Sequence, residues 1–239
     1  MLSINEIYLG DCLEIMNLID DKSVDMVLCD LPYGTSQNKW DIIIPFEPLW
    51  RHYERIIKDR GAIVLTASQP FTSMLVVSKL NLFKYEWIWE KTISSGQLNA
   101  NKQPLRNHES ILIFYKKQPS YNPQFKTGTA YKIYRQVTYN NRGYGTQKDT
   151  KKINNGYRYP QSVLKISNPR IKNGHPTQKP LELFEYLIKT YTNAGNLVLD
   201  NCIGSGTTAL ACINTFRDFI GIEKDPKYFA LAKEAIVRK

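Results

Sequence analysis

Alternation of short apolar segments with amphipathic ones constrains this chain more than any other feature of its sequence. Apolar runs bounded by Gly, Pro, Asn or Asp are typical of buried strands, and apolar residues at helical spacing are typical of helices packed on a sheet. Strands are predicted at residues 4–9, 24–29, 61–66, 85–89, 110–115, 196–200 and 218–223, and helices at 12–19, 46–58, 70–80, 180–191, 208–214 and 226–237. This alternation predicts an α/β fold with a mostly parallel sheet.

The strand at 24–29 runs directly into an unusual group of residues, Asp30-Leu31-Pro32-Tyr33. In an open α/β sheet, ligands bind at the carboxyl edge of the strands. Asp30 offers a hydrogen-bond acceptor, Tyr33 offers a flat face, and Pro32 fixes the backbone between them. Such a group suits a flat ring that bears an amine. Ordinary β-turns use the same residue types, so this stretch alone leaves both interpretations open.

A second strand, at 196–200, runs into a glycine loop at residues 201–208. Gly204 and Gly206 let the backbone approach a ligand, and the following helix directs its N–H groups at it. Glu223 ends the next strand, where an acid can accept hydrogen bonds from two ribose hydroxyls. The loop also fits a dinucleotide fingerprint, so an NAD enzyme is one alternative. Against NAD, no residues supply a hydride-transfer site.

The segment between residues 116 and 175 has a different composition. It holds thirteen Lys and Arg residues against one acid, Asp149, and so accounts for the whole net charge of +10. Seven tyrosines are interleaved with these basic residues. Basic side chains neutralise phosphates, and tyrosines stack on bases, so the segment predicts contact with nucleic acid. A solvated, loop-rich insertion without special function is the alternative.

Cellular context is predicted from cysteines and apolar runs. No apolar run approaches the roughly 20 residues that a membrane helix needs, and no signal peptide is visible. The four cysteines form no Cys-x-x-Cys pair and only three histidines accompany them. Free thiols therefore fit better than disulfides or a metal site. We expect a cytoplasmic protein without a membrane partner or a bound metal.

Several motifs resemble blocks of a known family. Asp30-Leu31-Pro32-Tyr33 is similar to the catalytic tetrapeptide, D-P-P-Y or S-P-P-Y, of S-adenosylmethionine-dependent DNA amino-methyltransferases. Residues 200–208 resemble their cofactor loop, D-P-F-x-G-S-G-T-T, and residues 175–180 match H-P-T-Q-K-P. Residues 10–14 and 107–112 also look like family blocks. The order of catalytic motif, basic region and cofactor motif resembles the β class, whose chain is permuted.

The resemblance implies a fold and an organisation. The expected fold is Rossmann-like, with a mostly parallel twisted sheet, helices on both faces, permuted order and a basic loop-rich insertion. Residues 1–115 would form the catalytic half, 116–174 a target-recognition insertion, and 175–239 the half that binds the cofactor S-adenosylmethionine. The implied partner is double-stranded DNA. A homodimer and a cognate restriction endonuclease are further expected partners.

The implied activity is site-specific methylation of adenine at N6, after the base has been flipped out of the duplex. An aspartate as first residue of the tetrapeptide favours adenine, and N4-cytosine methylation is the runner-up. Two further alternatives are a nucleic-acid-binding protein with impaired catalysis and an enzyme acting on RNA. Asp30 and the Leu31 carbonyl would accept hydrogen bonds from the amine, Tyr33 would stack on the base, and Pro32 would hold them in place.

The resemblance also implies cofactor contacts. Glu223 would bind the ribose, Asp200 would lie near the methionine amine, and the loop would supply Gly204, Gly206 and Thr207. Further contacts are expected from Asp11 and Cys12 at the adenine, and from Thr177 and Lys179 at the methionine end. For Thr177 and Lys179, a simple lead-in to the helix that begins at Pro180 is the alternative.

Two departures from the family pattern stand out. Leu31 replaces a proline, which is tolerable because its backbone carbonyl is the functional group. Asn201-Cys202 replaces Pro-Phe in the cofactor loop, and this change is expected to alter cofactor affinity.

Overall fold

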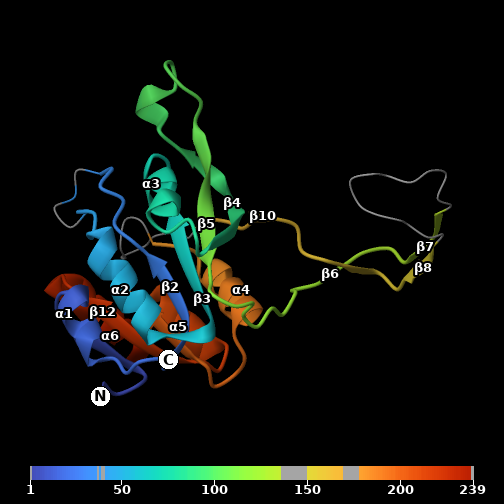
Figure 1. Cartoon of the computed structure of the whole chain (residues 1–239). Helices are drawn as coiled ribbons and strands as arrows, with labels where there is room; N and C mark the ends of the chain where they lie inside the picture. The colour runs from blue at the N-terminus through green and yellow to red at the C-terminus, as the bar shows by residue number, and fades with distance from the viewer. Residues whose placement is uncertain (1, 37, 39–40, 136–149, 169–177, 238–239) are drawn as a thin grey trace. The chain divides into compact units, whose positions relative to one another are not determined.

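The computed structural model describes residues 2–36, 38, 41–135, 150–168 and 178–237. Two compact units divide the chain (Figure 1). The larger unit is Met1–Asn122 with Ser162–Lys239, and the smaller is Pro123–Gln161. These boundaries lie inside the insertion predicted at 116–174, whose functional limits stay a prediction.

The larger unit is built on one eight-stranded sheet. All neighbouring strands are parallel except β5, which runs antiparallel to both β3 and β4. The predicted mostly parallel sheet is therefore confirmed. From one edge to the other the strands are β1 (Glu6–Leu9), β12 (Asp218–Glu223), β11 (Leu197–Asp200), β2 (Val24–Asp30), β3 (Ile57–Ala67), β5 (Arg106–Phe114), β4 (Phe83–Ser95) and β10 (Val163–Lys165).

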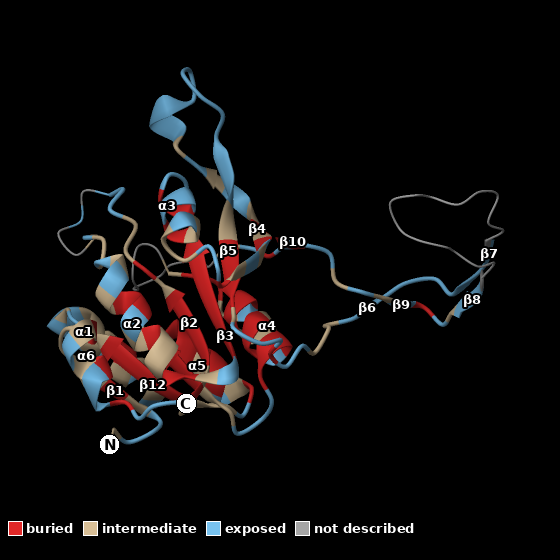
Figure 2. Ribbon diagram, viewed as in Figure 1, coloured by how far each residue is buried: buried red, intermediate tan, exposed pale blue. Residues whose placement is uncertain are grey.

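Helices cover both faces of this sheet, as predicted. Side chains alternate along a strand, so β2 sends Met26 and Leu28 into one hydrophobic cluster and Val27 and Cys29 into the other. The first cluster is closed by α4 (Leu181–Tyr191), α5 (Thr207–Asn214) and α6 (Pro226–Val237). The second is closed by α1 (Cys12–Ile15), the short 3₁₀ helix η1 (Met16–Leu18), α2 (Phe46–Ile56) and α3 (Phe71–Ser78). Figure 2 shows these cores as buried.

The order of strands reverses between β11 and β2. From β11 the chain passes through α5 to β12 on one side, and from β2 through α2 to β3 on the other. The carboxyl ends of two such strands flank a crevice, because the connections leave in opposite directions. Asp200 ends β11 and Asp30 ends β2, so both acids stand at this crevice.

Two features differ from the sequence-based expectation. β4 and β5 extend well beyond residues 85–89 and 110–115, and together they form a hairpin that projects from the sheet (Figure 1). We call residues 91–108 the β4–β5 arm; its tip holds the 3₁₀ helix η2 (Gln97–Asn99). In addition, β10 joins the sheet edge beside β4, in a stretch predicted to be loop.

The smaller unit contains two short antiparallel pairs. β6 (Lys126–Thr127) pairs with β9 (Tyr157–Arg158), and β7 (Tyr131–Arg135) pairs with β8 (Thr150–Asn154). Its described residues contribute nothing to the two hydrophobic clusters. Across the described part of the whole chain, no helix has the length and apolar character needed to span a membrane.

Candidate active site

A cavity of about 870 Å³ opens at the carboxyl edge of the sheet and brings most of the predicted site residues together. Thr177 lies outside the described residues, and Gly206 is not among the residues that line the cavity. The predicted residues that do line it are Asp11, Cys12, Asp30, Leu31, Pro32, Tyr33, Lys179, Asp200, Gly204, Thr207 and Glu223.

The carboxylate of Asp30 is held by three donors. Its Oδ1 accepts hydrogen bonds from the Tyr33 hydroxyl (2.7 Å) and from the Thr66 hydroxyl, and its Oδ2 accepts one from Lys179 Nζ (2.6 Å). Thr66 is the residue that pairs with Asp30 in the register of β2 and β3, so the sheet itself positions this donor. The carboxylate is thereby fixed at the wall of the cavity.

Lys179 is the buried centre of a chain of charges. Only 6% of the residue is exposed, and its Nζ lies 3.2 Å from Glu109 Oε2 as well as beside Asp30. Glu109 in turn pairs with Lys91. Burial alone would lower the pKa of Lys179, but the carboxylates of Asp30 and Glu109 more than offset it and raise that pKa, so the lysine stays cationic.

Sequence reasoning placed Lys179 beside the cofactor and gave Glu109 and Lys91 no role. The structure shows Lys179 paired with Asp30, and its predicted contact with the methionine end of the cofactor stays a prediction. Glu109 lies in the family-like block 107–112. That block could have singled out Glu109, but it gave no sign that Glu109 pairs with Lys179.

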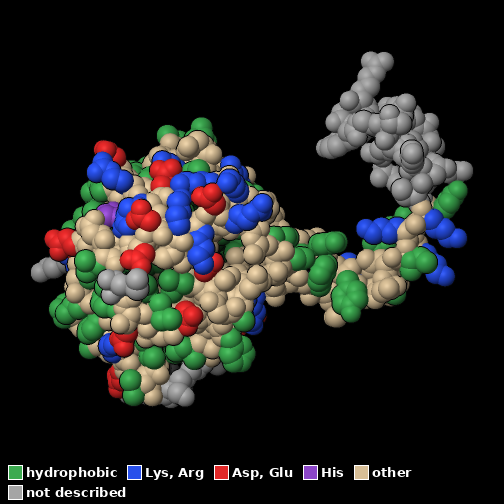
Figure 3. All heavy atoms as spheres, turned by 60° about the horizontal axis from the view of Figure 1, so that its bottom comes forward, with side chains coloured by type: hydrophobic (Ala, Val, Ile, Leu, Met, Phe, Trp, Pro, Cys, Tyr) green, Lys and Arg blue, Asp and Glu red, His purple; other side chains and the backbone are tan. Residues whose placement is uncertain are grey.

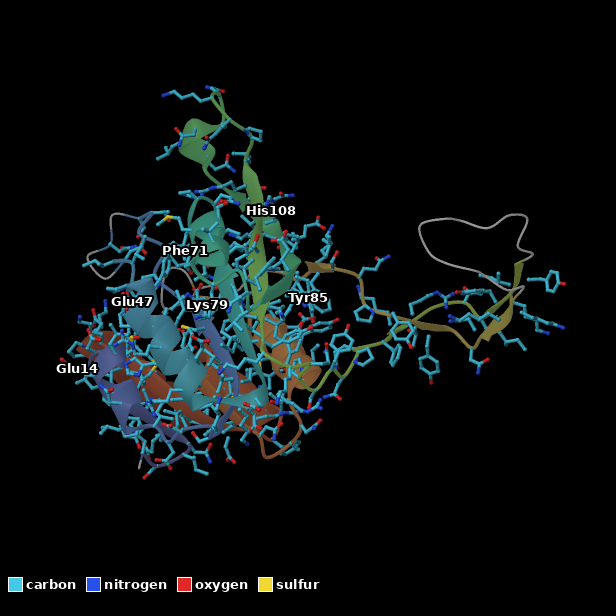
Figure 4. The ribbon with its side chains drawn as sticks, viewed as in Figure 1. Glu14, Glu47, Phe71, Lys79, Tyr85 and His108 are labelled. Atoms are coloured by element: carbon cyan, nitrogen blue, oxygen red, sulfur yellow. The ribbon has the colours of Figure 1, made fainter. Side chains whose placement is uncertain are left out.

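The ring of Tyr33 is fixed on one side. It stacks on Phe71 of α3, with ring centroids 5.2 Å apart and planes 25° apart, and Lys179 Nζ lies 5.5 Å from its centroid. Figure 4 shows Phe71 on α3 and His108 on β5. Burial raises the pKa of Tyr33, so its hydroxyl stays protonated and donates to Asp30.

Asp200 and Asn201 fix the start of the glycine loop, residues 201–208. Asp200 is buried and accepts hydrogen bonds from the Thr208 hydroxyl and from the Cys202 backbone N–H (3.0 Å). Burial raises its pKa to about 7. Asn201, where the family pattern has proline, accepts a 2.6 Å hydrogen bond from the buried Tyr53 hydroxyl. The departure from the pattern therefore has a hydrogen-bonding role, while its effect on affinity stays a prediction.

Glu223 connects the glycine loop to the end of β12. Its Oε2 accepts a hydrogen bond from the Gly204 N–H (2.8 Å) and its Oε1 accepts one from the Asp225 N–H (2.8 Å). Burial raises the pKa of Glu223. Gly206 precedes α5 with φ +88°, and a Cβ there would lie 3.2 Å from Ala232, so glycine is required for packing on α6.

Asp11 lines the cavity and caps the N-terminus of α1. Its carboxylate accepts hydrogen bonds from the Leu13 N–H (2.9 Å) and from Lys224 Nζ (2.9 Å), and Lys224 lowers its pKa. Cys12 follows it as a buried free thiol.

The cavity's chemistry fits a nucleoside cofactor that bears an amine. Glu223 and Asp200 line it with carboxylates, groups that can accept hydrogen bonds from hydroxyls or pair with an ammonium group, and Cys12 and Ile203 add apolar surface. Among the described residues, no cluster of three His, Cys, Asp or Glu side chains has the arrangement of a metal site. The arrangement suits group transfer by placement.

Positive charge is concentrated in the smaller unit. Its described residues include Lys and Arg but no acid (Figure 3), whereas both signs are mixed on the visible face of the larger unit. The basic residues of the smaller unit whose side chains are described are Lys126, Lys132, Lys151, Lys152 and Arg158.

Comparisons with known proteins agree with this geometry. A family described as DNA methylase, covering the N6 and N4 types, matches residues 24–234. The chain is 28% identical to Type II methyltransferase M1.MboII of Moraxella bovis, covering 95% of each chain. It is also 28% identical to DNA adenine methyltransferase YhdJ of Escherichia coli (strain K12), covering 93% of this chain and 79% of the relative. The crystal structure of an M1.HpyAVI–SAM complex superimposes with a TM-score of 0.65 at 27% identity, covering 96% and 98% of the two chains.

Proposed function

Because the chain belongs to the N6/N4 DNA methylase family, it is an S-adenosylmethionine-dependent DNA methyltransferase, and we propose that it methylates the N6 amine of adenine at specific sites in double-stranded DNA. The observation that carries the proposal is the Asp30 carboxylate, fixed at the wall of a cavity large enough for a cofactor and a base together.

The exocyclic amine of adenine is a weak nucleophile because its lone pair is delocalised into the ring. Asp30 and the Leu31 carbonyl accept hydrogen bonds from its two N–H groups, which directs the lone pair away from them and towards the methyl donor. Bound S-adenosylmethionine supplies an electrophilic methyl group on a sulfonium. A nitrogen–carbon bond forms as the carbon–sulfur bond breaks, and the cationic amine then loses a proton, for which Asp30 is the adjacent acceptor.

The base has to leave the duplex to reach Asp30. Tyr33 offers the flipped base a ring that Phe71 already holds in place, so little rotamer freedom is lost on stacking. Glu223 and Asp200 are proposed to hold the ribose and amine of the cofactor. Gly204, Gly206 and Thr207 form the proposed loop contacts, and Asp11, Cys12, Thr177 and Lys179 are further proposed contacts.

Aspartate as the first tetrapeptide residue and the similarity to YhdJ support adenine. N4-cytosine methylation is the second candidate, because the matching family includes N4 enzymes. The name Type II methyltransferase of the Moraxella relative supports a cognate restriction endonuclease as partner. A homodimer stays a prediction.

Methylation-sensitive sequencing of DNA from cells that express the chain tests the proposal. N6-methyladenine at one recurrent sequence is expected, and N4-methylcytosine would establish the second candidate instead.

Asp30→Ala should lower transfer of tritiated methyl groups by about a thousandfold or more, because the amine loses its orienting acceptor. Its dissociation constant for S-adenosylmethionine, measured by calorimetry, should stay within about threefold. Retained turnover in Asp30→Ala would contradict the role given to Asp30.

A further inference from the structure

The β4–β5 arm, residues 91–108, rises from the same edge of the sheet as the cavity. β4 and β3 both run antiparallel to β5, so β4 is parallel to β2 and its carboxyl end lies at the edge where Asp30 stands. The base of the arm contributes Ser95, Arg106 and His108 to the wall of the cavity. The arm projects from this edge beyond the strands that carry it (Figure 1).

Hydrogen bonds between its own backbone groups hold the arm together, and it packs against few residues outside itself. The Ser95–Arg106 pair closes the strands, and the Asn99 N–H donates to the Gly96 carbonyl (2.9 Å) at the tip. At the root of the arm, the Asn168 side chain accepts a hydrogen bond of 3.0 Å from the Ile93 N–H. Every residue from 97 to 108 is exposed (Figure 2). A hairpin without a packed face gains little stability of its own, and this one leaves its side chains free to contact another molecule.

The side chains of the arm suit nucleic acid. From residue 91 to 108 there is no acid, while Lys102 and Arg106 are basic and exposed. Leu98, at the tip, is 100% exposed. Amide side chains, which pair with base edges, surround it at Gln97, Asn99, Asn101, Gln103 and Asn107.

We propose that the arm inserts into the DNA duplex next to the target base, and that Leu98 occupies the space which the flipped base leaves. This inference rests on the proposed function, since only a flipped base leaves such a space. A base that enters the cavity leaves its duplex beside the arm, because both lie at one edge of the sheet. Apolar side chains act as wedges between base steps in other DNA-binding proteins, and the neighbouring amides can pair with the unpartnered base opposite.

The role predicts a dependence on how firmly the target base is stacked. Filling the vacated space offsets part of the cost of unstacking, which is least for a base that has lost its partner. Loss of Leu98 should therefore slow methylation only where the base has to be extruded from an intact pair.

The test compares two duplexes that carry the recognition sequence found by sequencing. In one the target base is paired, and in the other it faces an abasic site. Leu98→Ala should lower kcat/KM about tenfold or more on the paired duplex and less than about threefold on the abasic one. Leu98→Met should restore most of the rate. The matched control is Leu80→Ala, an exposed leucine before the opposite end of β4, which should change neither rate.

Equal loss on both duplexes, or no loss on either, would overturn the inference. A second measurement does not depend on turnover. The fluorescence of 2-aminopurine at the target position should rise when the wild-type protein binds and rise less with Leu98→Ala. An equal rise would overturn the role of Leu98. Absence of methyl transfer by the wild-type protein on both duplexes would refute the proposed function instead.

Discussion

At the residue scale, Asp30 differs from a free carboxylate because hydrogen bonds from neighbouring side chains fix the orientation of its carboxylate before any substrate binds. Tyr33 and Thr66 occupy one oxygen and Lys179 the other. Prior placement of an acceptor lowers the entropy that has to be lost when the amine binds. The same arrangement makes Lys179 a residue whose loss should affect both stability and chemistry.

Lys179→Met should lower the free energy of unfolding by about 3 kcal/mol, because Asp30 and Glu109 would face each other without the cation between them. Denaturant unfolding measures the change, and methyl transfer should fall with it. The control is Lys189→Met, which removes a more exposed pair with Glu185 at 3.8 Å and should cost less than about 0.5 kcal/mol. Unchanged stability together with a large loss of cofactor affinity would instead place Lys179 with the cofactor.

Asp200 is expected to make cofactor binding depend on pH. Burial raises its pKa to about 7, so the carboxyl is mostly neutral near pH 6 and mostly anionic near pH 8. If the anion binds the cofactor's amine as proposed, the fraction able to bind rises about tenfold across these two pH units. Calorimetry should then show the dissociation constant for S-adenosylmethionine falling about tenfold from pH 6 to pH 8. Asp200→Asn should remove this dependence, and an unchanged slope in that variant would assign it to another group, such as Glu223.

At the element scale, the parts of the fold that carry the site were predictable because each is encoded locally. The apolar run at 24–29 became β2, and the run at 196–200 became β11, because buried central strands need continuous apolar residues. Pro180 and the glycine loop marked where α4 and α5 begin. The adjacency of β11 and β2, which brings Asp30 and Asp200 to one crevice, came only from the assembled sheet.

The β4–β5 arm was missed for the opposite reason. Residues 91–108 are largely polar and lack an apolar face, so their strand conformation depends on pairing between β4 and β5 and not on local pattern. The Lys179–Glu109 pair was missed because it joins residues 70 positions apart, and spacing in the sequence carries no distance. Both are long-range features that only the assembled sheet supplies.

At the scale of the whole molecule, we expect the smaller unit to add contacts with DNA to those of the larger unit, and to take no part in cofactor binding. Both hydrophobic clusters and every described residue of the candidate site belong to the larger unit. The smaller unit carries described basic residues without acids, and exposed tyrosines. The larger unit should therefore fold and bind cofactor without the smaller one.

Replacing residues 123–161 by a Gly/Ser linker of about 15 residues, whose r.m.s. span is about 20 Å, tests this division. The midpoint of thermal unfolding should change by less than about 5 °C, and cofactor affinity by less than about threefold, because no core residue is removed. DNA affinity should fall at least about tenfold, and its dependence on salt should weaken, because Lys126, Lys151, Lys152 and their neighbours no longer displace counterions. Fluorescence anisotropy over a range of salt concentrations measures both effects. Undiminished DNA binding would move recognition to the larger unit, where the β4–β5 arm is the surface that remains beside the cavity.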